Sequence, residues 1–164
     1  MSLQLQPPQP LLASQLLDGF DCGETMLDDW LKRRAISNQF SGTSRTFVVA
    51  DQDGRVVGYY AVAAGAVAHQ LASSAVRRNM PDPVPVLVLA RLAVDRRAQG
   101  IQLGGALLQD AVKRALAVAE NAGVRALLVH ALHERAGAFY AHYGFQPSPV
   151  HPLTLMLRLN IAQP

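Results

Sequence analysis

Cysteine is almost absent from this chain, and its scarcity excludes two kinds of site. Cys22 is the only cysteine in 164 residues, so neither a disulfide framework nor a cluster of thiolate metal ligands can form. Long apolar runs are also missing, since none reaches the roughly 18 residues that a membrane-spanning helix needs. Residues 1–10 lack the basic start and apolar segment of a secretion signal. We therefore expect a soluble cytoplasmic protein that makes no membrane contact.

Lysine is scarce as well. Lys32 and Lys113 are the only lysines, so the net charge of +3 is almost wholly due to arginine. The planar guanidinium group favours bidentate contacts with phosphate, which favours polyanionic partners, although a GC-rich genome would produce the same bias. With 164 residues and 50% hydrophobic content, the chain can fill one core, and we expect a single domain over residues 1–164.

The stretch from Val86 to Asp110 organises the rest of the chain. Its first part, Val86 to Val94, is rich in β-branched residues and leucine and predicts a buried strand, and the segment from Leu103 predicts a helix. The turn between them, residues 99–105, carries three glycines. Such a turn directs backbone N–H groups outward at the positive end of a helix dipole. It predicts an anion cradle suited to a pyrophosphate, and its simpler interpretation is a glycine-relieved connection between strand and helix.

The remaining segments predict an α/β sandwich in which helices flank a mixed central sheet. A capping box at Asp21 to Glu24 starts a helix that runs to about Phe40. A β-hairpin, a short helix, the central strand and its helix, and a final strand–helix–strand series follow. Their expected bounds are 46–50 and 56–67 for the hairpin, 69–79 for the short helix, 86–94 and 103–122 for the central pair, and 124–129, 134–143 and 153–159 for the last three elements.

The glycine turn resembles the pyrophosphate loop Q/R-x-x-G-x-G/A of the GNAT N-acetyltransferases. Gln99 occupies the first position and Gly104 the last, but Gln102 stands where that family has its central glycine. The likeness extends to the GNAT toxins of bacterial toxin–antitoxin modules and covers the chain from about residue 20 to 159. The segments that carry it are Phe20–Gly23, Ser44–Val49, Gly58–Tyr60, Ala90–Asp95, Ala138–Tyr140 and Tyr143–Pro149.

This resemblance implies the GNAT fold and an enzyme that moves acetyl from acetyl-CoA to the primary amine of the amino acid on a charged tRNA, which blocks translation. It also implies a ribbon-helix-helix antitoxin, repression of operator DNA only through the toxin–antitoxin complex, and a homodimer. The expected coenzyme contacts are Leu92, Ala93, Val94, Arg97, Gln99, Gly100, Gln102, Gly104 and Gly105.

The expected chemistry needs a neutral amine, a polarised carbonyl and a proton for the departing thiolate. An α-amine has a pKa of about 7.7 to 8, so it needs no strong base, and a backbone N–H near Ala93 or Val94 would polarise the acetyl oxygen. In the resembling enzymes a tyrosine that matches Tyr140 donates the proton. Sequence alone also allows Tyr140 to be a packed aromatic residue beside Phe139, and it allows Tyr143, which we expect to cap the core, as a rival donor.

Other polar residues have simpler interpretations. His130 and His133 lack a third ligand, so we expect no metal site, and Cys22 is either a thiol of lowered pKa in a capping turn or a small packed residue. Helix-face arginines are usually solvated, but six arginines from separate segments form a candidate tRNA-binding set: Arg33, Arg34, Arg45, Arg77, Arg78 and Arg91.

Two alternatives to the toxin activity remain. The first is a GNAT enzyme for a small amine or a protein N-terminus, and the second is a noncatalytic module that binds acyl-CoA. The first alternative is favoured if the arginines form no basic face beside the acetyl site. The second is favoured if acetyl-CoA is not turned over with any amine.

Overall fold

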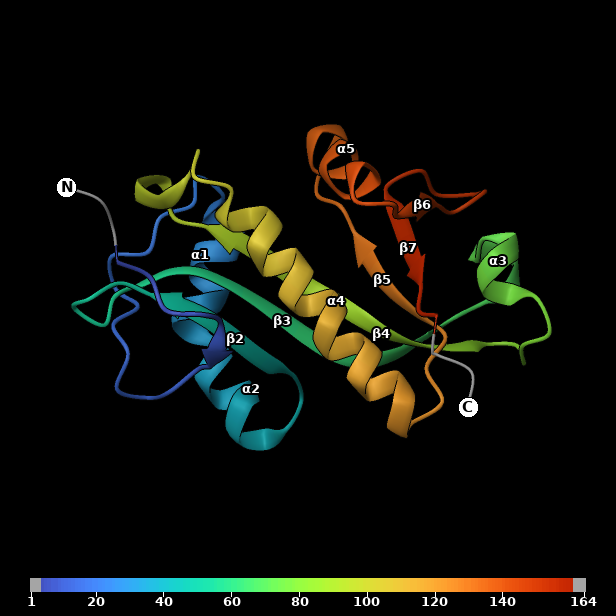
Figure 1. Ribbon diagram of the computed structural model, residues 1–164, viewed down its shortest axis with the longest axis horizontal. Helices are drawn as coiled ribbons and strands as arrows, with labels where there is room; N and C mark the ends of the chain where they lie inside the picture. Colours follow the sequence, from blue (N-terminus) through green and yellow to red (C-terminus); the bar gives the residue numbers. More distant parts are fainter. Residues whose placement is uncertain (1–3, 161–164) are drawn as a thin grey trace. The chain divides into compact units, whose positions relative to one another are not determined.

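The computed structural model describes residues 4–160 and contains a mixed sheet with helices (Figure 1). The strand order is β1-β2-β3-β4-β5-β7-β6. In chain order the elements are β1 (Gln9–Pro10), α1 (Thr25–Arg33), α2 (Ala35–Ser41), β2 (Arg45–Ala50), β3 (Val56–Val67), η1 (His69–Leu71), α3 (Ser74–Arg77), β4 (Val84–Val94), η2 (Arg96–Ala98), α4 (Leu103–Asn121), β5 (Ala126–His130), α5 (Glu134–His142), β6 (Gln146–Pro147) and β7 (Thr154–Arg158).

The contacts divide the chain into two compact units. Unit 1 comprises Met1–Ala63 and Ala90–Ala111, and unit 2 comprises Ala64–Leu89 and Val112–Pro164. Three elements, β3, β4 and α4, continue from one unit into the other. Within residues 4–160 no helix combines the length and the apolar character needed to cross a bilayer.

Unit 1 is built on the antiparallel hairpin of β2 and β3, as the sequence predicts. The register pairs Val48 with Tyr59 and slips by one residue between Val49 and Ala50. Because side chains alternate along a strand, the face that carries Val48 and Tyr59 is one core surface, and α1 covers it through Leu31. Tyr59 is fully buried there, and its hydroxyl donates to the Leu27 carbonyl at 2.7 Å.

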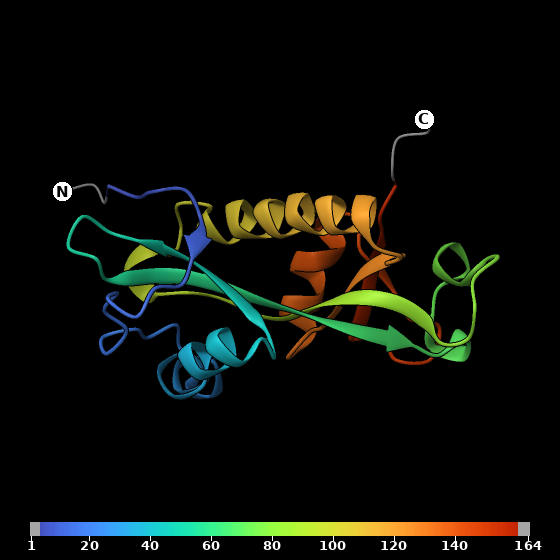
Figure 2. The same ribbon diagram turned by 90° about the horizontal axis from the view of Figure 1, so that it is seen from below.

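The opposite face of β3 in unit 1 is covered by the first turns of α4 (Figure 2). Gly58 makes the close approach possible, because a Cβ built there would lie 3.0 Å from Leu107 Cδ1 and 3.1 Å from Leu103 Cδ2. The next residue on this face, Tyr60, is fully buried and donates from its hydroxyl to the Asp110 carboxylate. A glycine and a hydrogen-bonded tyrosine therefore fix how α4 lies on the strand in unit 1.

Unit 2 joins β4 to β5 in parallel register and β5 to β7 in antiparallel register. Successive residues of β7 face opposite sides of the sheet, so two separate helices can pack on this strand. Met156 lies in a buried cluster with Val76 of α3, whereas Leu155 lies beside Gly137 of α5. Both helices contact β7 within this unit (Figure 1).

The prediction of one helix from the Asp21–Glu24 capping box to about Phe40 is wrong about where the helix starts and about its continuity. The helix begins at Thr25, and its N-cap residue, Glu24, makes no side-chain cap hydrogen bond. Asp21 cannot serve as the cap because it lies four residues before the first helical residue, where its carboxylate accepts from the Gly23 N–H. Arg34, with φ −122° and ψ −29°, separates α1 from α2.

Two further predictions differ from the structure. Residues 69–79 form two short pieces, η1 and α3, instead of one helix. The helix before Gly123 ends at Asn121, whose side-chain amide donates to the Ala117 carbonyl, and Gly123 is not among the residues of positive φ within 4–160. The helix expected over 134–143 is confirmed to within one residue, because α5 ends at His142 and Gly144 follows it with φ +94°.

Replacing Leu107 by alanine should lower the free energy of unfolding by about 2–5 kcal/mol, because this fully buried side chain fills the space over Gly58. Urea unfolding measures the change. The matched control is Val118→Ala on the same helix, where the side chain is exposed and a change below about 1 kcal/mol is expected. Equal losses for both variants would show that the helix does not pack on β3 through Leu107.

Candidate active site

The end of the central strand leads directly into the predicted anion cradle. β4 ends at Val94, the 3₁₀ turn η2 follows, and α4 begins at Leu103. Within residues 4–160 we find no protein acceptor for the backbone N–H groups of residues 100–105. The first backbone N–H of α4 that makes a hydrogen bond is that of Ala106, which donates to the Gln102 carbonyl. Unpaired N–H groups at the start of a 19-residue helix attract an anion through the helix dipole.

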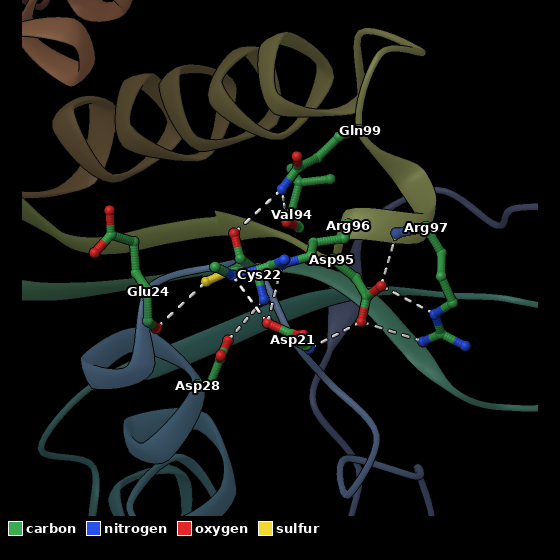
Figure 3. Close-up of polar contacts among 10 residues, drawn as sticks. Asp21, Cys22, Glu24, Asp28, Val94, Asp95, Arg96, Arg97 and Gln99 are labelled. Carbon is green, nitrogen blue, oxygen red and sulfur yellow. Dashed lines mark hydrogen bonds and ion pairs between the residues drawn. The ribbon is translucent and has the colours of Figure 1, made fainter.

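Asp95 fixes the base of this loop (Figure 3). Its side chain is 1% exposed and accepts four hydrogen bonds. The Asp21 N–H donates to Oδ2 at 3.0 Å, and Arg97 donates from its backbone N–H, from Nε and from Nη2 at 2.9, 2.9 and 3.3 Å. Burial opposes ionisation, but the hydrogen bonds from Arg97 and Asp21 and the charge of Arg97 lower the pKa of Asp95 overall.

Two further contacts attach the turn before α1 to the same loop. The Gln99 amide nitrogen donates to the carbonyl oxygens of Cys22, at 3.2 Å, and Val94, at 3.0 Å. The Arg96 N–H donates to the Asp21 carbonyl at 2.8 Å. An exposed ion pair between the side chains of Arg96 and Asp21, at 3.3 Å, adds little because water screens it. Backbone and amide contacts therefore hold the loop in place without any ligand.

Gln102 keeps the backbone conformation that a glycine would adopt. Its φ is +64°, in the left-handed region that L-residues with a Cβ rarely occupy, and Gly100 has φ +84°. The departure from the expected glycine therefore leaves the path of the loop intact, at a conformational cost of about 1–2 kcal/mol. Nothing lies within 4 Å of a Cβ built on Gly100, so the loop is open on that side.

The predicted coenzyme residues occupy different positions along this segment. Ala93 packs its side chain in the core of unit 1, so its backbone is the part available to a ligand. Arg97 directs its guanidinium group to Asp95, which makes it a support of the loop as well as a candidate phosphate contact. Leu92 and Val94 are half-buried on the strand, and Gly104 and Gly105 lie in the first turn of α4.

Tyr140 lies on α5 in unit 2 and is only 6% exposed. Its ring contacts Phe139 edge-on, with centroids 5.1 Å apart, and Phe145 at 5.6 Å. Burial raises the pKa of its hydroxyl to about 12, so the group is protonated at neutral pH. Within residues 4–160 this hydroxyl makes no hydrogen bond that would occupy its proton.

The rival groups near Tyr140 have structural roles or are exposed. Tyr143 does not cap the core as predicted, because 36% of it is exposed and its ring contacts Phe139 and His142 at the surface. His133 is the N-cap of α5, with Nδ1 accepting from the Ala136 N–H at 3.1 Å. His130 Nδ1 lies 3.0 Å from the Thr154 hydroxyl. Among residues 4–160 no group of three or more His, Cys, Asp or Glu side chains is placed to hold a metal.

Of the two interpretations of Cys22, the structure supports a small packed residue and not a thiol of lowered pKa. Burial, with a hydrogen bond from the thiol to the Asp28 carboxylate as the next cause, raises the pKa of the thiol to about 12, so the predicted lowering is wrong. Asp28 of α1 faces inward and accepts from the Cys22 N–H at 2.9 Å. The thiol in the turn before α1 therefore stays protonated at neutral pH and is not activated.

Four of the six candidate arginines belong to unit 1, and they differ in availability. Arg91 lies with its guanidinium carbon 4.4 Å from the centre of the Trp30 ring, a cation–π contact, and Trp30 in turn stacks on Tyr59. Arg45 donates to the Gln39 carbonyl. Arg33 and Arg34 are exposed at the end of α1. In unit 2, Arg77 ends α3 and Arg78 follows it, and both are also exposed.

Comparison with known proteins decides which family this site belongs to. The acetyltransferase (GNAT) domain family matches residues 43–147, which include the hairpin, the cradle and Tyr140. The chain belongs to the GNAT acetyltransferases. A tRNA-acetylating toxin of Mycobacterium tuberculosis (strain ATCC 25618 / H37Rv) is 52% identical to this GNAT chain over 156 residues, which cover 95% of the chain and 93% of the relative.

Solved structures of GNAT toxins have the same fold. AtaT complexed with acetyl-methionyl-tRNAfMet is 26% identical, with a TM-score of 0.85 and coverage of 96% of this chain and 95% of the other. A tyrosine-to-phenylalanine mutant of AtaT bound to acetyl-CoA and to the C-terminus of the antitoxin AtaR is 25% identical, with a TM-score of 0.80 and coverage of 96% and 93%. An AtaT–AtaR complex bound to DNA is 26% identical, with a TM-score of 0.76 and coverage of 94% and 95%.

The GNAT cradle fits the pyrophosphate of acetyl-CoA on its own geometry. The N–H groups of residues 100–105 are unpaired within the described part of the chain, and the loop is open at Gly100. Sequence reasoning found this loop but missed Asp95, Asp21 and Arg96, which hold it. A local signal for Asp95 did exist, because an acidic residue directly after a buried strand, with arginine two positions later, is placed to accept from that arginine.

Replacing Asp95 by asparagine should lower the free energy of unfolding by about 1–3 kcal/mol at neutral pH, because Arg97 would lose its charged partner in a buried site. A carboxylate of lowered pKa stabilises the fold above its unfolded pKa, and this contribution is lost as the pH falls through its folded pKa. Urea unfolding from pH 7 to pH 3 should therefore show the two proteins converging at acid pH. Asp53→Asn, in the exposed hairpin turn, is the control.

Replacing Gln102 by glycine should raise the free energy of unfolding by about 1 kcal/mol, because glycine adopts φ +64° without strain. Acetyl-CoA affinity, measured by calorimetry, should change little because the loop already has the required path. Gly100→Ala, at φ +84° with open space around the new Cβ, should have the opposite effect on stability. A loss of stability in Gln102→Gly would contradict the strained conformation.

Proposed function

We propose that this protein is a toxin acetyltransferase that moves acetyl from acetyl-CoA to the primary amine of the amino acid on charged tRNA and so blocks translation. The observation that carries this conclusion is the 52% identity, over 95% of the chain, to a tRNA-acetylating toxin. The cradle at the start of α4 supports it independently, because it offers the donors that a pyrophosphate requires. We propose one GNAT domain for the whole chain, since three elements run through both units.

The chain's own residues have separate tasks in this reaction. Acetyl-CoA supplies the activated acetyl group as a thioester. The backbone N–H groups of residues 100–105 bind its pyrophosphate, with Gly104 and Gly105 allowing close approach. Leu92, Ala93 and Val94 present backbone groups at the end of β4, where an N–H polarises the acetyl oxygen. Asp95 and Gln99 keep these groups in position.

Tyr140 holds the proton that the departing thiolate requires. Its ring is buried, and its hydroxyl is protonated at neutral pH and has no hydrogen-bond partner in the described chain. An acceptor amine with a pKa of about 8 or below is partly neutral at pH 7 to 8, so the site needs no strong base. This preference favours the α-amine of an esterified amino acid over a lysine side chain, whose pKa is near 10.4.

The antitoxin and operator complexes follow from the same assignment. We propose that a ribbon-helix-helix antitoxin neutralises the protein and that the pair binds its operator, as AtaT and AtaR form complexes with each other and with DNA. A homodimer and a cytoplasmic site of action are also proposed, because charged tRNA and the ribosome are in the cytoplasm. The six arginines at 33, 34, 45, 77, 78 and 91 are proposed tRNA contacts.

Replacing Tyr140 by phenylalanine should retain acetyl-CoA binding and reduce acetyl transfer by about 100-fold or more, because it removes the buried proton donor but keeps the ring packing. Calorimetry measures coenzyme affinity, and growth arrest after induction measures toxicity. Tyr143→Phe, on the exposed neighbour, is the matched control and should arrest growth as the wild type does. Full growth arrest from the Tyr140 variant would exclude the proton-donor role.

The function itself is tested with acetyl-CoA and total charged tRNA. After nuclease digestion, mass spectrometry should detect N-acetyl-aminoacyl adenosine, and its mass identifies the amino acid. Acetylation of a small amine or a protein N-terminus, with charged tRNA untouched, would instead support the alternative GNAT activity. Coenzyme binding without acetylation of any amine would support the noncatalytic module.

A further inference from the structure

The excess of positive over negative charge in this protein belongs to unit 2. This unit contains seven arginine and lysine residues against three acidic residues, whereas unit 1 contains eight against nine. Unit 2 therefore accounts for more than the whole net charge of +3. All five histidines also belong to it. By net charge, a polyanion is therefore attracted more strongly by unit 2 than by unit 1.

Arg125 anchors the basic part of unit 2. Its guanidinium group donates to the carbonyl oxygens of Ala75, Val76 and Arg78, at 3.2, 3.2 and 3.1 Å. These carbonyls belong to α3 and to the residue that follows it, where the helix leaves backbone acceptors unpaired. The anchor fixes the main chain at Arg78 and leaves the Arg78 side chain exposed.

Arg158 brings a third guanidinium group to the same place. β7 pairs Arg158 with Ala126, and the next residue, Leu159, donates its N–H to the Arg125 carbonyl at 3.0 Å. Burial and then the charges of Arg158 and Arg78 lower the pKa of Arg125, so both of these groups lie close enough to Arg125 to repel it. Within residues 4–160 no carboxylate forms an ion pair with any of the three.

We propose that Arg78, Arg125 and Arg158, the unit 2 arginine cluster, bind the phosphate backbone of the tRNA substrate. The inference deepens the proposed function and rests on it. Arg78 and Arg158 contact phosphates directly, and Arg125 positions Arg78 through the three carbonyls. Neither Arg125 nor Arg158 is recognisable from sequence as part of an RNA-binding set, because they lie on separate strands and become neighbours only in the folded sheet.

The chemistry of the cluster favours phosphate over an acidic peptide. Guanidinium groups held together without a carboxylate present a concentrated positive charge, and an RNA backbone offers a negative charge at every nucleotide. Guanidinium groups bind phosphate oxygens bidentately, which lysine does not, although they bind carboxylates in the same way. A segment of acidic residues on a protein partner is the competing occupant, and the test below separates the two.

The test uses charge reversal in the full-length protein, with Arg78→Glu, Arg158→Glu and the control Arg135→Glu. Arg135 is exposed on α5 in the same unit, so Arg135→Glu changes the net charge of unit 2 by the same amount and leaves the three cluster residues in place. Binding of uncharged tRNA is measured by fluorescence anisotropy from 50 to 300 mM salt. Acetylation of charged tRNA gives KM and kcat, and circular dichroism and thermal unfolding verify the fold.

Each cluster variant should weaken tRNA binding by about tenfold at low salt and flatten the dependence of log K on log salt by about 0.7–0.9 per lost phosphate contact. KM for charged tRNA should rise with kcat and acetyl-CoA affinity unchanged. Arg135→Glu should bind and react like the wild type. Because binding uses uncharged tRNA, it tests the cluster even if the wild type acetylates another amine, in which case the proposed function fails separately.

Folded cluster variants that bind tRNA as Arg135→Glu does would overturn the proposal. Unchanged tRNA binding combined with weakened neutralisation by the antitoxin would assign the cluster to a protein partner instead. An equal loss in all three variants would show only a general effect of net charge and would also overturn the assignment to this cluster.

Discussion

The carboxylate of Asp95 is the interaction on which the candidate site depends. It lies at the point where the central strand ends, and it receives donors from Asp21, far earlier in the chain, and from Arg97 in the following turn. One buried charge thus connects the segment before α1, the last residues of β4 and the start of the cradle. Its burial would be unfavourable alone, and the four hydrogen bonds compensate for it.

The sequence predicts most elements because their signals are local. Strand β4, helix α4 and the hairpin follow from apolar runs, periodicity and turn residues, and their observed bounds differ from the predicted ones by a few residues. The predicted start of α1 is wrong for a physical reason. Asp21 has the right side chain for a cap, but Asp95 and Arg96, more than 70 residues away, bind that turn and displace the helix start to Thr25.

The site is predictable only in part, for the same reason. The cradle and Tyr140 were found through the glycine turn and the resemblance to GNAT toxins. The exposure of Tyr143 and the inward orientation of Asp28 depend on packing that no single segment encodes. The unit 2 arginine cluster is a further example, because Arg125 and Arg158 approach Arg78 only through strand pairing and the cap on α3.

The raised pKa of Cys22 has a consequence for redox chemistry. A GNAT reaction releases coenzyme A as a free thiol, and once this thiol is oxidised to a disulfide, the disulfide exchanges with accessible protein thiolates. With a pKa of about 12, only about one Cys22 side chain in 10⁵ is ionised at pH 7, so mixed disulfides with the coenzyme form very slowly. Because Gln99 donates to the Cys22 carbonyl, a thiol that stays protonated leaves this support of the loop chemically intact when oxidants reach the cell.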